Sequence, residues 1–179
     1  MTAIWKGAHH DNYGIGRLGY KVEAIVIHLM DGTLAGTDSW FNASLAERQH
    51  AQPGAQVSSA HYGIGKDGSL HQYVQEPDRA FHAGRVQGQT WKNPKLGVIN
   101  TNHWTIGIEH EGHPGDEWPD AMYRASAELV AQIAGRYGFA ISRDTVVGHH
   151  EIFAPKVCPG PNADLNKLVT MAQQIGGGA

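Results

Sequence analysis

The hydrophobic pattern predicts several short strands, one of which is buried on both faces. Residues 24–27 form a continuous apolar run, which is typical of a central strand, and we expect this strand to extend over 21–29. A second strand, over 105–112, carries isoleucine at alternate positions, so that its isoleucines face one side. A third strand, over 145–147, is short and leads into a polar segment. The ends of central strands are where α/β proteins tend to place ligands.

Apolar residues recur at intervals of three and four in three other segments, which predicts helices. The clearest helix has Asp120 as its N-cap and Gly138 as the residue that ends it. We expect an earlier helix over 37–50 and a final helix over 162–174.

A hairpin and two irregular segments complete the pattern. Strands over 57–65 and 69–75 flank a tight Lys-Asp-Gly turn, and we expect them to pair antiparallel. Residues 76–102 show little regular pattern, and an irregular segment of that length in a compact domain is typical of a functional loop. We expect residues 1–20 to form an irregular arm that lies on the domain.

Composition limits the class of protein. The chain has 179 residues, which is enough for one domain with a sizeable core. Its 23 glycines and only 17% charged residues favour a loop-rich α/β protein over a helical bundle. The net charge of -3 provides no basic field for nucleic acid. We expect one monomeric domain over 1–175, with 176–179 as the start of a glycine-rich linker.

The sequence carries no recognisable targeting segment. Its first residues lack the basic and then apolar layout of a secretory signal, and no apolar run is long enough to cross a membrane. The expectation is a soluble protein that is made in the cytoplasm and has no membrane partner.

Candidate metal ligands lie at the ends of two predicted strands. His28 closes the strand over 21–29, and the loop after the strand over 145–147 carries His149 and Cys158. Cys158 is the only cysteine, so no intrachain disulfide can form and the thiol is free to act as a ligand. Two imidazoles and a thiolate would leave the fourth position of a tetrahedral zinc ion open. The residues alone are equally consistent with a hydrogen-bonded core histidine and an inert cysteine.

Five motifs in order carry a resemblance to a known family. They are Ile-Val-Ile-His-Leu (25–29), Val57 to Val74, Ala-Phe-His-Ala-Gly (80–84), Asn100 to Glu109, and Gly-His-His-Glu (148–151) up to Lys-Val-Cys-Pro-Gly (156–160). Together they resemble the zinc-dependent N-acetylmuramoyl-L-alanine amidases of type 2, a superfamily that includes peptidoglycan recognition proteins and phage endolysins. The resemblance covers residues 22–172. It implies a single α/β domain with a mixed β-sheet flanked by helices and zinc at one end of the sheet.

The resemblance also implies an activity and roles for particular residues. The reaction is hydrolysis of the amide that joins N-acetylmuramic acid to L-alanine in cell-wall peptidoglycan. His28, His149 and Cys158 match the zinc ligands. Glu109 matches the glutamate that serves as general base, and Lys156 matches a basic residue that stabilises the oxyanion.

Some assignments within the resemblance have alternatives. The interval from the second histidine to the cysteine in many relatives favours His150 as ligand, whereas the Gly-His-x-Glu pattern favours His149, which we adopt. Glu111 is an alternative carboxylate to Glu109. His82 either lines the substrate groove or fixes its loop by a hydrogen bond. Some relatives have a tyrosine where this chain has Ala60, so the expectation of a catalytic activity depends more on Glu109.

Two other classes of function compete with the enzyme. A non-catalytic peptidoglycan-recognition module commonly lacks the cysteine ligand, whereas Cys158 and Glu109 are both present here. A zinc-stabilised structural domain would need a fourth protein ligand, such as His150 or Glu151. We therefore expect the catalytic domain of a phage or prophage endolysin, which acts on the cell wall. Such a domain would be released by a holin and followed by a wall-binding domain.

Overall fold

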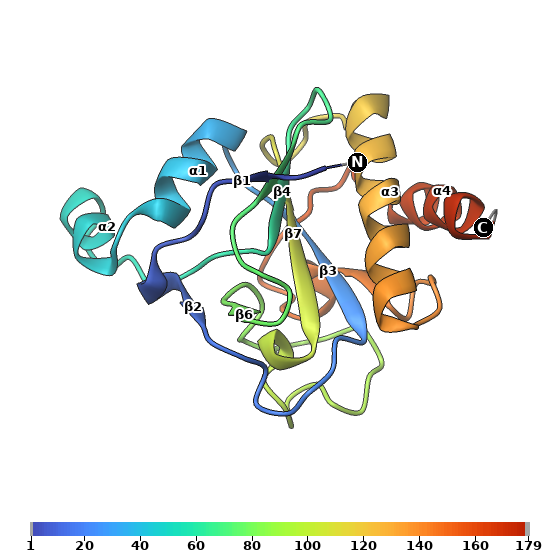
Figure 1. Ribbon diagram of the computed structural model, residues 1–179, viewed down its shortest axis with the longest axis horizontal. Coiled ribbons are helices and arrows are strands. Elements are labelled where there is room, and N and C mark those ends of the chain that lie inside the picture. The colour runs from blue at the N-terminus through green and yellow to red at the C-terminus, as the bar shows by residue number, and fades with distance from the viewer. Residues whose placement is uncertain (1, 178–179) are drawn as a thin grey trace.

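A six-stranded mixed sheet runs through the centre of the molecule (Figure 1). The computed structural model describes residues 2–177. The strands, in their order across the sheet, are β1 (Ile4–Trp5), β5 (Leu70–Gln72), β4 (Tyr62–Ile64), β7 (Thr105–His110), β3 (Ala24–Leu29) and β8 (Val146–Gly148). All neighbouring pairs are parallel except β4 and β5, which form the expected antiparallel hairpin. The predicted α/β class and mixed sheet are confirmed.

The register of the central strands brings distant residues together. β3 pairs with β7 so that His28 lies opposite Glu109. β3 pairs with β8 so that Ile27 lies opposite Gly148, and His149 follows at once. Because parallel strands end at the same edge of a sheet, their carboxyl ends meet there.

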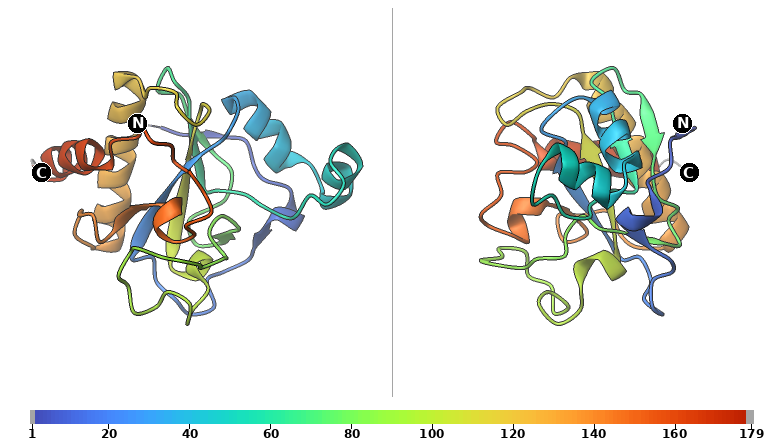
Figure 2. Two further views of the ribbon diagram at one scale, coloured as in Figure 1. Left: turned by 180° about the vertical axis from the view of Figure 1, so that it is seen from behind. Right: turned by 90° about the vertical axis from the view of Figure 1, so that its left-hand side faces the viewer.

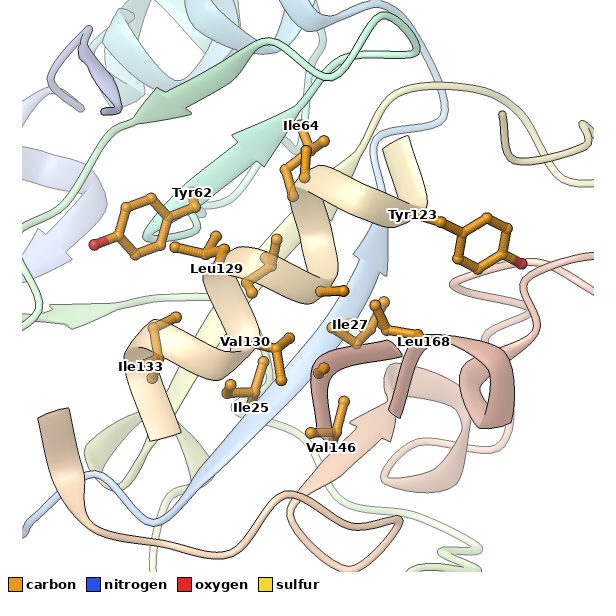
Figure 3. Close-up of a cluster of buried hydrophobic side chains, with 14 of the residues drawn as sticks. Ile25, Ile27, Tyr62, Ile64, Tyr123, Leu129, Val130, Ile133, Val146 and Leu168 are labelled. Atoms are coloured by element: carbon orange, nitrogen blue, oxygen red, sulfur yellow. The ribbon is translucent and has the colours of Figure 1, made fainter. Parts of the chain in front are cut away.

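One face of the sheet packs on two helices. These are α3 (Asp120–Tyr137) and α4 (Leu165–Gly176), which lie together on one side of the central strands (Figure 1). Ile25 and Ile27 of β3 point toward Val130 of α3 and Leu168 of α4 (Figure 3). This cluster is the main hydrophobic core.

The other face is covered by loops and by two short helices. Ala24 and Val26, which alternate with the isoleucines of β3, pack with Trp91 and Trp104 from the long segment before β7. The helices are α1 (Leu34–Asn42) and α2 (Leu45–Ala51), and the two views of Figure 2 place them across the sheet from α3 and α4. His28 follows the same alternation as Ala24 and Val26, so it belongs to this second face.

The first predicted helix is two helices. α1 begins earlier than expected, because the side chain of Thr33 accepts a hydrogen bond from Gly36 N and caps it. The backbone is extended at Ala43, and Ser44 then starts α2 with a capping box to Glu47. The sequence contains this Ser-x-x-Glu signal, but the prediction of one helix relied on the spacing of apolar residues instead.

Other boundaries also differ from the prediction. The N-cap of α3 is Pro119, and Asp120 is the first helical residue. The carboxylate of Asp120 accepts a hydrogen bond from Lys167 Nζ. Gly138 ends α3 in the left-handed conformation, at φ 72°, as predicted. α4 begins later than expected, at Leu165, because Asp164 caps it.

The N-terminal arm is more regular than predicted. Residues 4–5 form the edge strand β1, and the 3-10 helix η1 (His10–Asn12) follows. β2 (Tyr13–Gly14) then pairs with β6 (Arg79–Ala80) in a second, two-stranded sheet. The long segment before β7 is otherwise irregular, as expected, up to η2 (Thr101–His103).

The expected linker is only partly within the described residues. Gly176 is the last residue of α4 and Gly177 caps it, whereas 178–179 lie outside the described part of the chain. None of the helices in residues 2–177 combines the length and hydropathy needed to cross a membrane.

Candidate functional site

Three candidate metal ligands meet where β3 and β8 end. His28 is the next-to-last residue of β3, and His149 opens the 3-10 helix η3 (His149–Glu151) directly after β8. Their ring centroids are 4.6 Å apart, and Cys158 Sγ lies 3.8 Å from His28 Nδ1. The ligand atoms of the three residues all lie within 4.8 Å of one another. The structure thus groups the three predicted residues as the ligands of one small ion would be grouped.

The two alternative ligands are engaged elsewhere. His150 is exposed, and its Nδ1 lies 3.0 Å from the carbonyl oxygen of Cys158. The carboxylate of Glu151 accepts a hydrogen bond from Gly148 N at 2.7 Å and one from Arg143 Nη2 at 2.6 Å. Neither residue belongs to the group of three, so the arrangement leaves a fourth position open.

The environment keeps both imidazoles neutral. Burial holds the pKa of His28 well below its usual value and lowers the pKa of His149 to about 4, where Lys156 adds to the effect. A neutral imidazole has a lone pair to offer a metal. Burial also raises the pKa of the Cys158 thiol, while Leu29 N donates a hydrogen bond to its sulfur at 3.0 Å. The donor set of two nitrogens and one sulfur fits Zn²⁺.

Glu109 brings a carboxylate to the same site. One of its oxygens, Oε2, is buried and has no hydrogen-bond partner among the described residues. Burial raises the pKa of Glu109 to about 8, and the positive charge of Lys156 opposes that rise. A buried carboxylate without a partner costs stability, and such groups are found mainly where function requires them.

One cavity of about 200 Å³ unites these residues. Its lining includes all six residues singled out in the sequence, namely His28, His82, Glu109, His149, Lys156 and Cys158. A neighbouring cavity of about 320 Å³ shares Glu109, and another of about 390 Å³ shares His82, His149 and Lys156. The site cavity therefore adjoins both of these cavities.

Glu111, the alternative carboxylate, has a structural role. Its Oε1 accepts a hydrogen bond from Leu34 N at 3.2 Å, and its Oε2 accepts one from Lys66 N at 2.8 Å. It thereby ties the start of α1 to the β4–β5 turn. It is not among the residues that line the cavity.

A second group of possible ligands, His9, His10 and Asp11, lies on the N-terminal arm. Asp11 already accepts a hydrogen bond from Leu45 N at 3.0 Å, and Nδ1 of His9 accepts one from Asp11 N at 3.3 Å. His10 is exposed. These contacts join the arm to the start of α2 and account for the group without a metal.

Comparison with known proteins agrees with this geometry. A sequence model of the family described as N-acetylmuramoyl-L-alanine amidase matches residues 18–161. The chain belongs to this family. It is similar to N-acetylmuramoyl-L-alanine amidase A of Achromobacter lyticus, with 38% identity over 139 residues. That match covers 76% of this chain and 63% of the relative, so the chain spans less than two thirds of the relative's length.

Solved structures of amidases share the fold. The crystal structure of a selenomethionine derivative of AmpD superposes with a TM-score of 0.74 and 25% identity, covering 94% of this chain and 93% of that one. A mutant endolysin from Bacillus subtilis superposes with a TM-score of 0.62 and 16% identity, covering 96% of this chain and 99% of that one. The likeness to the endolysin is one of fold alone.

Proposed function

We propose that this amidase-family chain is a zinc-dependent hydrolase that cuts the amide between N-acetylmuramic acid and L-alanine in peptidoglycan. One observation carries the proposal. The cavity that gathers the nitrogen and sulfur donors of His28, His149 and Cys158 also holds the carboxylate of Glu109, one oxygen of which has no hydrogen-bond partner within residues 2–177. Binding of peptidoglycan without cleavage would not require such a carboxylate beside the metal ligands.

His28, His149 and Cys158 would hold the zinc ion. When bound, zinc would polarise the scissile carbonyl, lower the pKa of the attacking water and favour the ionised form of Glu109. Glu109 would take a proton from the water and return it to the nitrogen of the departing L-alanine. General acid–base catalysis of this kind contributes about 10²–10⁴-fold in rate.

Lys156 is the second residue that we assign to the reaction. It is exposed but lines the same cavity, and its charge acts on Glu109, His149 and Cys158. An ammonium in that position would stabilise the negative charge that develops on the carbonyl oxygen.

We propose intact cell wall as the substrate, as an endolysin would use. Two further cavities share lining residues with the site, which supports a substrate larger than the cut bond and its immediate neighbours. The Achromobacter relative is a bacterial protein, and a bacterial amidase that acts on released muropeptides would prefer soluble fragments. Substrate preference therefore distinguishes an endolysin, which would prefer intact wall, from an amidase of released muropeptides.

Digestion of defined substrates tests the proposal. Protein loaded with one equivalent of zinc should release stem peptides with a new N-terminal alanine from purified peptidoglycan, and faster than from soluble muropeptides. Binding to the wall without any new amine would instead indicate a recognition module. Faster cleavage of soluble fragments would support the amidase but reject the endolysin setting.

A further inference from the structure

We propose that His82 is a positioning residue that selects the tautomer of His28 and so makes Nδ1 of His28 the atom that binds the metal. This inference rests on the proposed zinc site. The observation behind it is a chain of hydrogen bonds from the carbonyl of Thr101, through Thr105 and His82, to His28.

The direction of the chain follows from its far end. The hydroxyl of Thr105 donates to the carbonyl oxygen of Thr101 at 2.8 Å, because a carbonyl can only accept. Thr105 Oγ1 has a single hydrogen, so it must accept from Nε2 of His82, which lies 3.3 Å away. In a neutral ring the other nitrogen of His82, Nδ1, is then an acceptor.

The near end of the chain sets the state of the ligand. His28 Nε2 lies 3.0 Å from Nδ1 of His82, so it must carry the proton and donate it. The lone pair of His28 is then on Nδ1, which is the nitrogen that lies 3.8 Å from Cys158 Sγ. A metal-binding histidine usually donates its other N–H to a carboxylate, a carbonyl or water. Here a second histidine takes that place.

Contacts with β7 and with Asn102 fix the position of the His82 ring. A Cβ on Gly107 would lie 2.6 Å from Cγ of His82, so only glycine at this position of β7 lets the ring lie against the strand. The side chain of Asn102 accepts hydrogen bonds from His82 N at 3.2 Å and from Ala83 N at 2.8 Å. These contacts fix the loop that carries His82, and they give a physical reason for Gly107 in the Ile-Gly-Ile-Glu motif.

The assignment changes the role expected for His82. His82 lines the cavity, which is one of the two roles that the sequence left open, but its two ring nitrogens contact His28 and Thr105. It therefore has no ring nitrogen left to bind substrate. Its contribution is made through the metal ligand.

Zinc affinity measured by competition with a chelator tests the proposal. Loss of an outer partner of a metal ligand typically lowers metal affinity about 10–100-fold, and we expect this for His82→Ala. His82→Asn should recover much of the loss, because its Oδ1 takes the place of Nδ1 as acceptor. His103→Ala serves as the matched control, since His103 is close in sequence to Thr105 but outside the chain of hydrogen bonds. All variants carry His10→Ala, which removes the second group of possible ligands.

Thr105 provides an independent test that leaves both histidines in place. Thr105→Val removes the acceptor for His82 and should weaken zinc binding, whereas Thr105→Ser should retain it. Nitrogen-15 NMR of the metal-free protein should show the proton of His28 on Nε2, and zinc should shift Nδ1. Zinc coordination through Nε2, or equal affinity of His82→Ala, Thr105→Val and the parent, would overturn the proposal. Failure of the parent itself to bind zinc would instead reject the proposed metal site.

Discussion

Glu109 is placed where a carboxylate is unfavourable to the fold. It lines the site cavity near the end of β7, one of its oxygens has no partner among the described residues, and its pKa is raised. A glutamine of the same shape would relieve most of this cost. The structure therefore separates the contribution of Glu109 to stability from its contribution to chemistry.

The first prediction follows from this separation. Glu109→Gln should bind zinc like the parent protein and fold at least as well, because the amide fills the same space without a charge. It should lose about 10²–10⁴-fold in the rate of wall hydrolysis, since the proton acceptor is gone. Metal analysis, thermal unfolding and amine release from peptidoglycan measure the three quantities.

Glu111→Gln is the matched control, because it makes the same change two residues further along the chain, just after β7. The carboxylate of Glu111 holds Leu34 N and Lys66 N, so its replacement should lower the unfolding temperature and leave turnover close to the parent's. An unchanged rate in Glu109→Gln, or a large rate loss in Glu111→Gln, would contradict the assignment of the base.

The second prediction concerns the metal ligands. Cys158→Ser and His149→Ala should each lower the zinc content of protein purified with one equivalent of metal, because each removes one of three donors. His150→Ala should keep its zinc, since that ring is exposed and contacts the carbonyl of Cys158. Metal content after dialysis against a weak chelator is the measurement. Loss of zinc from His150→Ala with retention in His149→Ala would reverse the assignment.

Single residues of the site could be predicted from sequence better than their partners could. Motif order pointed to His28 and Glu109, and the register of two parallel strands then brought them together. The hydrogen bonds that the His82 segment donates to Thr105 and Asn102 have no such signal, because they depend on how an irregular loop packs on β7. The sequence shows Gly107 only as part of a motif. It does not show that the His82 ring leaves no space for a side chain at this position.

At the scale of elements, local hydrogen bonds decided the boundaries that apolar periodicity missed. The period continued across residues 37–50, yet Ser44 and Glu47 close a capping box that starts a new helix. Asn12 reinforces the break, because its side-chain amide donates to the carbonyls of Phe41 and Ala43. Asn12 belongs to the N-terminal arm, so no pattern within residues 37–50 could reveal these two hydrogen bonds.

The third prediction uses two glycines of α3 that should respond oppositely to one substitution. Gly135 is exposed inside the helix, and a Cβ there would meet no atom within 4 Å. Gly135→Ala should therefore stabilise the protein by up to about 1 kcal/mol. Gly138 ends the helix at φ 72°, where a Cβ is strained, so Gly138→Ala should destabilise it by about 1 kcal/mol.

Denaturant unfolding of the two variants measures both effects on one helix. Zinc content and hydrolysis should stay unchanged, because α3 packs on the face of the sheet away from the site. If both variants shifted stability in the same direction, helix propensity and cap geometry would not be the terms that matter here.

At the scale of the whole molecule, the sheet separates stability from chemistry. Ile25 and Ile27 face α3 and α4 in the main core, while Ala24, Val26 and then His28 face the loops. Sequence alternation predicts this division, because successive residues of a strand point to opposite faces. It does not predict which loops close the second face. That depends on contacts such as Trp91 with Trp104, between segments that show no regular period.

The molecule also contains an unusual number of histidines held neutral. Burial lowers the pKa of His103 and, by more, the pKa of five others, namely His28, His61, His82, His110 and His149. His61 has a second reason to stay neutral besides burial. Gly107 N donates a hydrogen bond to its Nδ1 at 3.0 Å, so that nitrogen cannot also carry a proton. Unfolding frees these rings to take up protons near their ordinary pKa.

The fourth prediction is that pH changes the stability of the metal-free protein in opposite directions through its buried histidines and through Glu109. As pH falls through about 6.5, the unfolded chain binds protons that the five folded histidines refuse, so the free energy of unfolding decreases by about 1.4 kcal/mol per pH unit for each proton taken up. Glu109 acts in the opposite direction. Its folded pKa of about 8 lies above the ordinary value of 4.5, so its share of stability is lost as pH rises between those values.

Thermal unfolding in the presence of a chelator, at pH 5, 6.5 and 8, separates the two contributions. Five histidines outweigh one carboxyl, so the parent should be less stable at pH 5 than at pH 6.5. Between pH 6.5 and 8 the histidines of the unfolded chain release their remaining protons, which raises stability, while Glu109 lowers it. The difference between Glu109→Gln and the parent isolates the second effect: the variant should gain stability relative to the parent from pH 6.5 to pH 8, and both should lose stability at pH 5. A parent profile that is flat from pH 5 to 6.5 would show that these histidines are not held neutral by the fold, and identical profiles for parent and variant at pH 8 would show that Glu109 is not strained by its burial.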